Sequence, residues 1–284
     1  MSNEKQNIRK RVEKLKNIPT MPGIFEKITP LIDSSDTAAE DIAHIISSDQ
    51  VLSAKVLRVV NSVFYGFPGR ISSLTHALII LGFDVVKGLM LSTSVFDMML
   101  AKGLHGLWEH SLGCAVTAGV IARKTNHPNP EEVSIAALLH DIGKLIIRIE
   151  LPEESSRIDQ RTSEKRILSY EAEEEILGLN HATVGKWLCK EWHLPEQLSN
   201  PIAYHHKPSL SKSYQKSTAI VHTADVLVRG FGFGFPGDTI VPQIDQTAWE
   251  LLNISDSLLE EIIKDMDEKL EDADDFLSDS GIRT

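Results

Sequence analysis

Apolar residues recur every three or four positions through most of the chain, and the strict alternation typical of a β-strand is rare. Prolines and glycines interrupt these runs at residues 18–23 and 64–70, and Gly82 follows a run that starts near residue 71. The spacing therefore predicts an all-α protein whose helices are separated by short turns.

Short polar residues precede two of the early apolar runs, as expected for helix N-caps. Asp36 or Thr37 can cap one helix, and Ser48 or Asp49 can cap the next. Residues 51–64 are apolar nearly all round, which predicts a buried helix.

A polar cluster interrupts the apolar run at residues 136–147, where His140 and Asp141 stand side by side. A buried carboxylate is costly unless a metal, a cation or several hydrogen bonds compensate it. If the run is helical, Lys144 projects toward the same side, and Gly143 leaves room for another group to approach the backbone. A locally capped Asp and a solvated Lys would explain the same pattern without a functional site.

Other histidines and aspartates occur on separate predicted helices or helix ends. Imidazoles and carboxylates that converge from several helices build metal centres in helical bundles. In chain order these residues are His110, His181, His205, His206 and Asp225.

With His140 and Asp141, this order resembles the HD superfamily of metal-dependent phosphohydrolases. The resemblance implies one divalent metal held by His110, His140, Asp141 and Asp225, with Asp141 bridging to a second metal held by His181, His205 and His206. It implies catalytic roles for Asp141 and for Lys144, which would face a substrate phosphate. If a single metal is bound, one histidine of the pair 205–206 would orient rather than ligate.

The first half of the chain is similar to a branch of that superfamily, the HDOD (HD-related output domain) family of bacterial signalling modules. The similarity rests on residues 48–52, 57–62 and 77–82 and extends from about residue 15 to residue 206. It implies an HD-domain-like helical bundle in three parts: an N-terminal helical lobe over residues 1–104, an HD-type metal-site lobe over 105–230, and a C-terminal loop with an acidic amphipathic helix over 231–284.

The resemblance implies a metal-dependent phosphohydrolase or phosphodiesterase that acts on a nucleotide-like signalling phosphoester. Many HDOD proteins lack the metal ligands and act as regulatory interaction modules, so a non-catalytic module with a structural or vestigial metal is the alternative. A metal-free helical scaffold would require every ligand match to be coincidental. Residues 207–210 replace the Gly-Tyr-Pro motif of cyclic-di-GMP phosphodiesterases, which leaves that substrate unsupported.

Net charge narrows the choice of partner. The chain carries a net charge of -11, of which -8 comes from ten acidic residues and two lysines within residues 255–275. This balance argues against a nucleic-acid duplex or an anionic membrane as partner. It leaves a phosphorylated small molecule, a signalling protein and a second copy of the chain in a homodimer as candidates.

Donor chemistry and cysteine content give two further expectations. Imidazoles and carboxylates without thiolates favour iron or manganese, with zinc, nickel or cobalt as alternatives. Cys114 and Cys189 are the only cysteines and are interpreted as core residues of a protein in a reducing cytoplasm. The polar start of the chain shows no signal peptide or membrane span, so a cytoplasmic location is expected.

Four peripheral features remain open. The polar stretch 149–170 is either a lid or a surface connection, and the aromatic-glycine loop 231–237 either docks on the core or gates the site. Residues 255–270 predict an amphipathic helix that packs on the bundle or on a second subunit, with weak order from residue 271. His222 could orient Asp225, touch a substrate or be structural. Surface or capping roles are expected for His44, His76, His105, His127 and His193.

Overall fold

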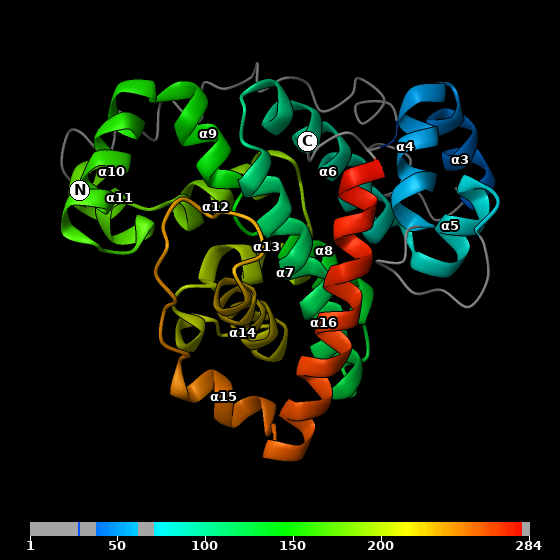
Figure 1. The fold of residues 1–284 in the computed structure, drawn as a ribbon. Helices are drawn as coiled ribbons and strands as arrows, with labels where there is room; N and C mark the ends of the chain where they lie inside the picture. The colour runs from blue at the N-terminus through cyan, green and yellow to red at the C-terminus, as the bar shows by residue number, and fades with distance from the viewer. Residues whose placement is uncertain (1–27, 29–37, 62–70, 280–284) are drawn as a thin grey trace.

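The computed structural model describes residue 28 and residues 38–61 and 71–279, and it confirms the all-α prediction (Figure 1). Within these residues no strand occurs. The helices are α3 (Ala39–Ser47), α4 (Gln50–Val60), α5 (Leu74–Leu81), α6 (Phe83–Ala101), α7 (His105–Lys124), α8 (Pro130–Leu139), α9 (Ile142–Glu150), α10 (Pro152–Lys165), α11 (Ser169–Leu177), α12 (His181–Glu191), α13 (Glu196–Tyr204), α14 (Gln215–Phe231), α15 (Gln246–Leu252) and α16 (Asp256–Asp279), with a short 3₁₀ helix at Pro208–Leu210.

Helices α3, α4 and α5 form a group at one end of the molecule (Figure 1). Asp49 accepts a hydrogen bond from the Leu52 amide at 2.9 Å, which confirms it as a cap of α4. Asn61 fastens the end of α4, because its side chain exchanges hydrogen bonds with the backbone of Ile71 at 2.7 and 2.8 Å. The prediction that residues 51–64 form a buried helix is wrong for its described part, since Val51 is 65% exposed and only one face of α4 is buried. Residues 62–64 and the proposed caps Asp36 and Thr37 lie outside the described residues.

Helix α6 connects this group to the rest of the molecule. It packs against α4 and α5 and also against α7 and α8. Most of its residues from Val85 to Val95 are buried, as expected for a helix that has neighbours on several sides. Gly82, with φ 78°, ends α5 and precedes α6, as its position after the apolar run predicted.

Helix α7 lies at the centre of the bundle. Every residue from His110 to Ala122 is buried, because α8, α14 and α16 all pack against this helix. Any polar side chain in the middle of α7 therefore depends on neighbouring helices for its partners.

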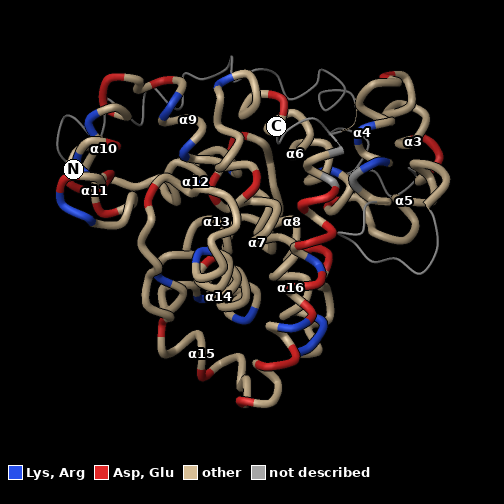
Figure 2. Tube along the Cα trace, in the orientation of Figure 1, with Lys and Arg blue, Asp and Glu red and all other residues tan. Residues whose placement is uncertain are grey.

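The C-terminal helix α16 packs on the bundle through α7. Packing on the bundle was one of the two predicted alternatives for this helix. Ile262 and Met266 are fully buried, whereas acidic residues line its outer side (Figure 2). Lys124 of α7 pairs with two of these acids, Glu261 and Asp265, at 3.0 Å each. The helix continues to Asp279, beyond residue 271, where weak order was expected.

The polar stretch 149–170 is largely helical. It forms α10, whose Ile158 is buried while its charged residues are mostly exposed. None of the described helices is both long enough and apolar enough to cross a membrane.

Candidate metal centre

His140 and Asp141 lie at the break between α8 and α9, and both side chains are fully buried. Lys144, in the first turn of α9, donates from Nζ to Asp141 Oδ2 at 2.7 Å. The predicted close approach at Gly143 is confirmed. A Cβ at this position would lie 2.0 Å from the carbonyl oxygen of His181, so glycine permits α9 and the start of α12 to touch.

On one side of Asp141 lie three histidines, which we call the imidazole side: His181, His205 and His206. The Nε2 atom of His181 lies 2.9 Å from Asp141 Oδ1. The same nitrogen lies 3.3 Å from His205 Nε2 and 2.8 Å from His206 Nε2. Both members of the 205–206 pair therefore face the cluster, and neither lies behind the other as an orienting group.

The Nδ1 atoms of three histidines are occupied by acceptors. His140 Nδ1 lies 2.6 Å from the carbonyl oxygen of Ala137, and His205 Nδ1 lies 2.9 Å from that of Ile202. His181 Nδ1 lies 2.7 Å from a carboxylate oxygen of Glu173. Because these oxygens only accept, each of these rings in its uncharged form carries its proton on Nδ1, and its Nε2 lone pair points into the cluster.

The opposite side, which we call the carboxylate side, comprises His110, Cys114, His140 and Asp225. His110 Nε2 lies 3.0 Å from Asp225 Oδ1 and 3.4 Å from Cys114 Sγ. Each of these four residues offers a ligand atom, and the four atoms lie within 4.8 Å of one another. Helices α7, α8 and α14 thus bring four donors to one point.

Arg229 holds Asp225 from one turn further along α14. Its Nε donates to Asp225 Oδ1 at 2.8 Å, and its Nη1 donates to Asp238 Oδ1 at 2.9 Å. Asp238 also accepts from the backbone amides of Ser169 and Ile240. This network links the carboxylate side to the segment that follows α14.

The acids of the cluster are ionised in spite of their burial. Burial opposes ionisation of Asp141, but His140 and Lys144 outweigh it and hold the pKa of that carboxyl well below its usual range. Burial likewise opposes ionisation of Asp225, whose pKa is held well below its usual range by Arg229. In contrast, burial raises the pKa of the Cys114 thiol well above its usual range, and Asp225 adds to this effect.

Most of the imidazoles with a resolved shift are neutral. Burial lowers the pKa of His205 and of His206 well below the usual imidazole range, and positive charge on neighbouring rings adds to it. Burial also lowers the pKa of His110, against the opposing effect of Asp225. Although burial disfavours the charged form of His181, Glu173 reverses the direction and raises the pKa of this ring. Neutral imidazoles with inward lone pairs are ready to bind a cation.

The chemistry of the cluster residues fits a bound metal ion. His140 Nε2 is fully buried and makes no hydrogen bond within the described part of the chain, and the buried Asp141 Oδ1 has the Nε2 atom of His181 beside it at 2.9 Å. Close Nε2 atoms whose lone pairs face one another repel unless a proton or a cation lies between them. Two ligand atoms, each about 2.1 Å from one ion, lie roughly 3 Å apart, which is the spacing seen on both sides of Asp141.

Three supporting residues were not among the predicted site residues: Cys114 was interpreted as a core residue, and Glu173 and Arg229 were assigned no role. Spacing could have indicated two of them. Cys114 follows His110 by four residues, and Arg229 follows Asp225 by four, so each pair shares a helix face. Glu173 gave no such signal, because α11 and α12 meet only through the turn between them. It accepts from both Nδ1 and the backbone amide of His181 at 2.7 Å.

Both ring nitrogens of His222 have partners other than Asp225. Its Nδ1 donates to the carbonyl oxygen of His205 at 2.7 Å, and its Nε2 accepts from the Asp245 amide at 2.9 Å. The ring thereby supports the backbone of His205, a residue of the cluster. Of the three roles considered for His222, this is the structural one.

Two hollows border the cluster. One has a volume of about 270 Å³, and Lys144, Arg148, Glu173 and Phe235 are among its lining residues. The other, of about 290 Å³, is lined by residues that include Tyr170, His206 and Asp225. Helix α10 contributes Ser155, Ile158 and Asp159 to the first hollow, so the polar stretch forms one of its walls.

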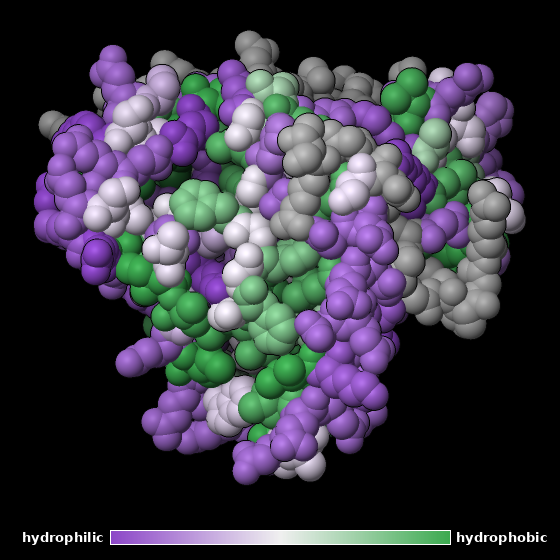
Figure 3. Space-filling model, viewed as in Figure 1, coloured by the Kyte–Doolittle hydropathy of each residue, from purple (hydrophilic) through white to green (hydrophobic). Residues whose placement is uncertain are grey.

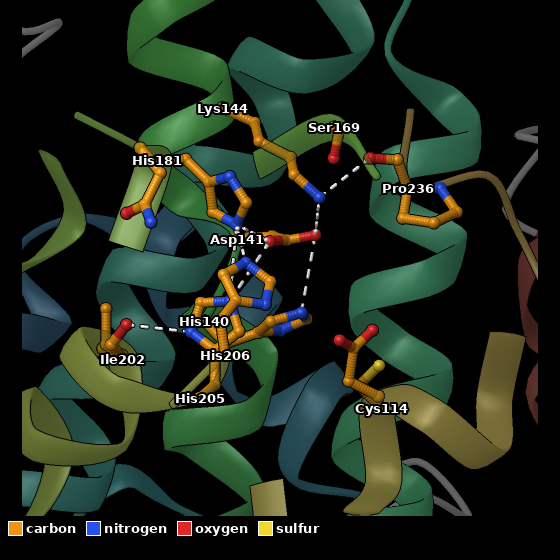
Figure 4. A network of polar contacts seen from close by, with 12 residues as sticks. Cys114, His140, Asp141, Lys144, Ser169, His181, Ile202, His205, His206 and Pro236 are labelled. Carbon is orange, nitrogen blue, oxygen red and sulfur yellow. Dashed lines mark hydrogen bonds and ion pairs between the residues drawn. The ribbon is translucent and has the colours of Figure 1, made fainter. Parts of the chain in front are cut away.

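The aromatic-glycine loop covers the cluster from the α7 side. Gly234, with φ 72°, lies against the backbone of His110, and the Phe235 amide donates to Gly106 at 2.7 Å. The Nζ atom of Lys144 lies between Asp141 and the carbonyl oxygen of Pro236, and it donates to that oxygen at 2.8 Å (Figure 4). Phe233 packs on the core, as the docking alternative predicted, whereas Phe235 remains 53% exposed. Apolar side chains also gather on this face around the loop and α15 (Figure 3).

Comparison with known proteins identifies the family. The chain matches the model of the HDOD domain over residues 18–208, most of its length, and it therefore belongs to the HDOD family. A solved HDOD domain protein of unknown function from Geobacter sulfurreducens is 28% identical, with a TM-score of 0.73 over 95% of this chain and 97% of that one.

Two further proteins are more distantly similar. A protein from Shewanella amazonensis SB2B, provisionally named a phosphohydrolase, is 21% identical with a TM-score of 0.66 over 93% of this chain and 97% of that one, which shows a shared fold. An uncharacterized protein of Treponema pallidum (strain Nichols) is 24% identical over 76% of this chain but only 43% of its own length. The chain thus spans less than half of this curated relative.

Proposed function

We propose that this HDOD protein is a metal-dependent phosphohydrolase that cleaves a phosphoester of a nucleotide-like signalling molecule. One observation carries the proposal: Lys144 contacts the Asp141 carboxylate at the cluster and also lines the hollow of about 270 Å³. A candidate phosphate-binding cation therefore stands between a candidate metal centre and a space for a small molecule.

The proposed ligands are His110, His140, Asp141 and Asp225 for one divalent ion and His181, His205, His206 and Asp141 for another. Bound divalent metals would supply Lewis-acid stabilisation of phosphoryl oxygens and an activated water. Within the protein, Lys144 uses two donors on Asp141 and Pro236, which leaves its third N–H for a phosphoryl oxygen.

The hollow limits the size of the substrate. Its volume lies near the lower end of the range of ligand pockets, about 300–1,000 Å³. Phe235 and several aliphatic side chains offer apolar contact, and Arg148, one turn after Lys144 on α9, offers a second cation. Asp159 of α10 holds this guanidinium at 2.7 and 3.2 Å. A single phosphoester with a compact apolar or aromatic group suits this space.

The test combines metal content with turnover. The protein, purified without chelator or metal-affinity tag, is compared with His140→Ala and Asp141→Ala by elemental analysis and by hydrolysis of p-nitrophenyl phosphate and bis-(p-nitrophenyl) phosphate. We expect bound metal and turnover in the parent and loss of both in the variants. Lys144→Ala is expected to keep the metal and lose turnover.

A different outcome separates the two classes of function. Stoichiometric metal in a protein that hydrolyses neither probe and no nucleotide phosphoester would contradict the hydrolase proposal. That result would support a regulatory module whose metal is structural. The full burial of His110, His140, Asp141, His181 and His205 is the observation that favours this second candidate.

A further inference from the structure

Cys114 places sulfur among the nitrogen and oxygen donors of the carboxylate side. We infer that its Sγ is a metal ligand, so that the carboxylate side binds a borderline ion such as Zn²⁺, Fe²⁺ or Co²⁺ in preference to Mg²⁺ or Mn²⁺. The inference rests on the proposed metal centre but not on the proposed hydrolysis, because it concerns which atom holds the ion.

The distances match two ligands of one ion. A metal–sulfur distance of about 2.3 Å and a metal–nitrogen distance of about 2.0–2.1 Å place S and N roughly 3.1–3.6 Å apart for angles of about 90–110°. Cys114 Sγ lies 3.4 Å from His110 Nε2, whereas it lies 3.9 Å from Nδ1. The thiol is thus nearer to the nitrogen that also faces Asp225.

The position of the thiol is fixed by the helix that carries it. His110 and Cys114 are one turn apart on α7 and share a face, and both side chains are fully buried. Figure 4 shows the Cys114 sulfur beside the group of histidines. An independent observation points to a ligand here, because His140 belongs to the same group and its buried Nε2, 3.4 Å from Asp141 Oδ2, makes no hydrogen bond to any residue that the structure describes.

Buried cations offset the added negative charge. A thiolate would join Asp141 and Asp225, giving three anions beside one divalent ion. The Arg229 side chain, which is 3% exposed, forms an ion pair with Asp225 at 2.8 Å. The Lys144 side chain, which is 9% exposed, forms one with Asp141 at 2.7 Å. Metal binding breaks the S–H bond, forms the S–metal bond and releases the proton to solvent.

The donor set changes the expected metal. The choice of iron or manganese from the sequence assumed that no thiolate took part. Sulfur ligands select zinc and other borderline ions over magnesium and manganese, which prefer oxygen. The imidazole side lacks a thiol among its grouped donors, so the preference applies to one of the two positions.

Cobalt reports the bond directly, since a thiolate bound to Co²⁺ gives a near-ultraviolet charge-transfer absorption that imidazole and carboxylate ligands do not give. The probe is Co²⁺ titrated anaerobically into metal-depleted full-length protein. Cys189, buried on α12 and outside the grouped donors, is the other cysteine of the chain and provides the matched control. We expect the band in the parent and in Cys189→Ala, and its absence in Cys114→Ser and Cys114→Ala. The Co²⁺ affinity should fall by about 10- to 100-fold in the Cys114 variants.

The band in Cys189→Ala is decisive even if the Cys114 variants fail to fold, because Cys114 is then the only thiol present. X-ray absorption of the zinc form should likewise show sulfur at about 2.3 Å. Cobalt bound without the band would overturn the thiolate ligand and leave the proposed hydrolase intact. No cobalt binding would overturn the thiolate ligand and the metal centre together.

Discussion

The two sides of Asp141 orient their ligands in different ways. On the imidazole side the ligands lie at helix ends, with His181 at the start of α12 and His205 at the C-cap of α13. On the carboxylate side, His110 and Asp225 lie within the long helices α7 and α14. His140 shares the first arrangement, as the C-cap of α8.

This difference determines what holds each ring or carboxylate. At a helix C-terminus the last carbonyls lack intrahelical partners, so His140 and His205 can each donate Nδ1–H to the carbonyl three residues earlier. Within a helix the carbonyls are occupied, and orientation comes from a side chain one turn away, as Arg229 provides for Asp225. The helix C-termini at His140 and His205 thus hold their rings through backbone carbonyls, whereas Asp225 within α14 is held by an ionic partner. His181, at a helix start, is held by the carboxylate of Glu173.

Replacing Asp141 by Ala should have the largest effect, because this carboxylate faces both sides. It also leaves the Lys144 ammonium without its carboxylate, and breaking a buried pair in this way costs about 3–5 kcal/mol of unfolding free energy. We expect metal loss from both sides by elemental analysis and a lowered urea midpoint. Asp267→Ala, at an exposed acid of α16, should change neither. Retention of a full metal complement in Asp141→Ala would contradict the bridging position.

Replacing Asp238 by Asn should weaken the carboxylate side alone. Burial opposes ionisation of Asp238, but Arg229 lowers the pKa of this carboxyl, so the ionised acid stabilises the fold. A carboxyl whose pKa is lower in the folded state than in the unfolded state stabilises the fold at pH values above its ordinary pKa of about 3.9. This contribution is lost as the pH falls through the pKa of the folded state. The variant should therefore be less stable by about 3 kcal/mol at pH 7, with the difference shrinking below about pH 4.

Urea unfolding of the metal-free proteins at a series of pH values measures this difference. A gap between parent and Asp238→Asn that stays constant as the pH falls would show that the loss is steric rather than ionic.

Replacing Gly143 by Ala should disturb the imidazole side through the backbone. The added methyl would overlap the carbonyl oxygen of His181, so α12 must move away from α9. Overpacking of this kind costs about 1–3 kcal/mol of unfolding free energy. Gly230→Ala is the matched control, because a Cβ at this helical position meets nothing within 4 Å. Thermal unfolding should separate the two variants, and equal stability would contradict the close approach.

Replacing Glu173 by Gln should have the smallest and most selective effect. The amide cannot match the charge that orients His181 through Nδ1, and loss of such an outer partner lowers metal affinity by about 10- to 100-fold. Competitive metal titration should show this loss for one of two equivalents. The Co²⁺–thiolate band of the carboxylate side should persist, and its loss would show that the two sides are coupled.

Local sequence determined most of the fold. The 3.6-residue periodicity predicted helices throughout, and Asp49 and Gly82 marked the ends of two of them. The pattern failed for α4, where apolar Val51 is exposed, because composition alone does not say how many neighbours a helix has. It left open whether the polar stretch that forms α10 is a lid or a surface connection, because the place of α10 as a pocket wall depends on its position beside α9.

The histidine and aspartate order was visible in the sequence because those residue types are costly to bury without a partner. The packing of α7, α8, α12, α13 and α14 decided where these groups lie. It brings His110, His140, Asp141 and Asp225 into one space and places His181, His205 and His206 on the other side of the Asp141 carboxylate. The tertiary structure alone brought Glu173 to His181 and Cys114 to the proposed ligands, since a thiol in an apolar helix looks the same in sequence whether it faces a leucine or a candidate metal centre. The sequence determined which groups must be satisfied, and only three-dimensional packing decided which groups satisfy them.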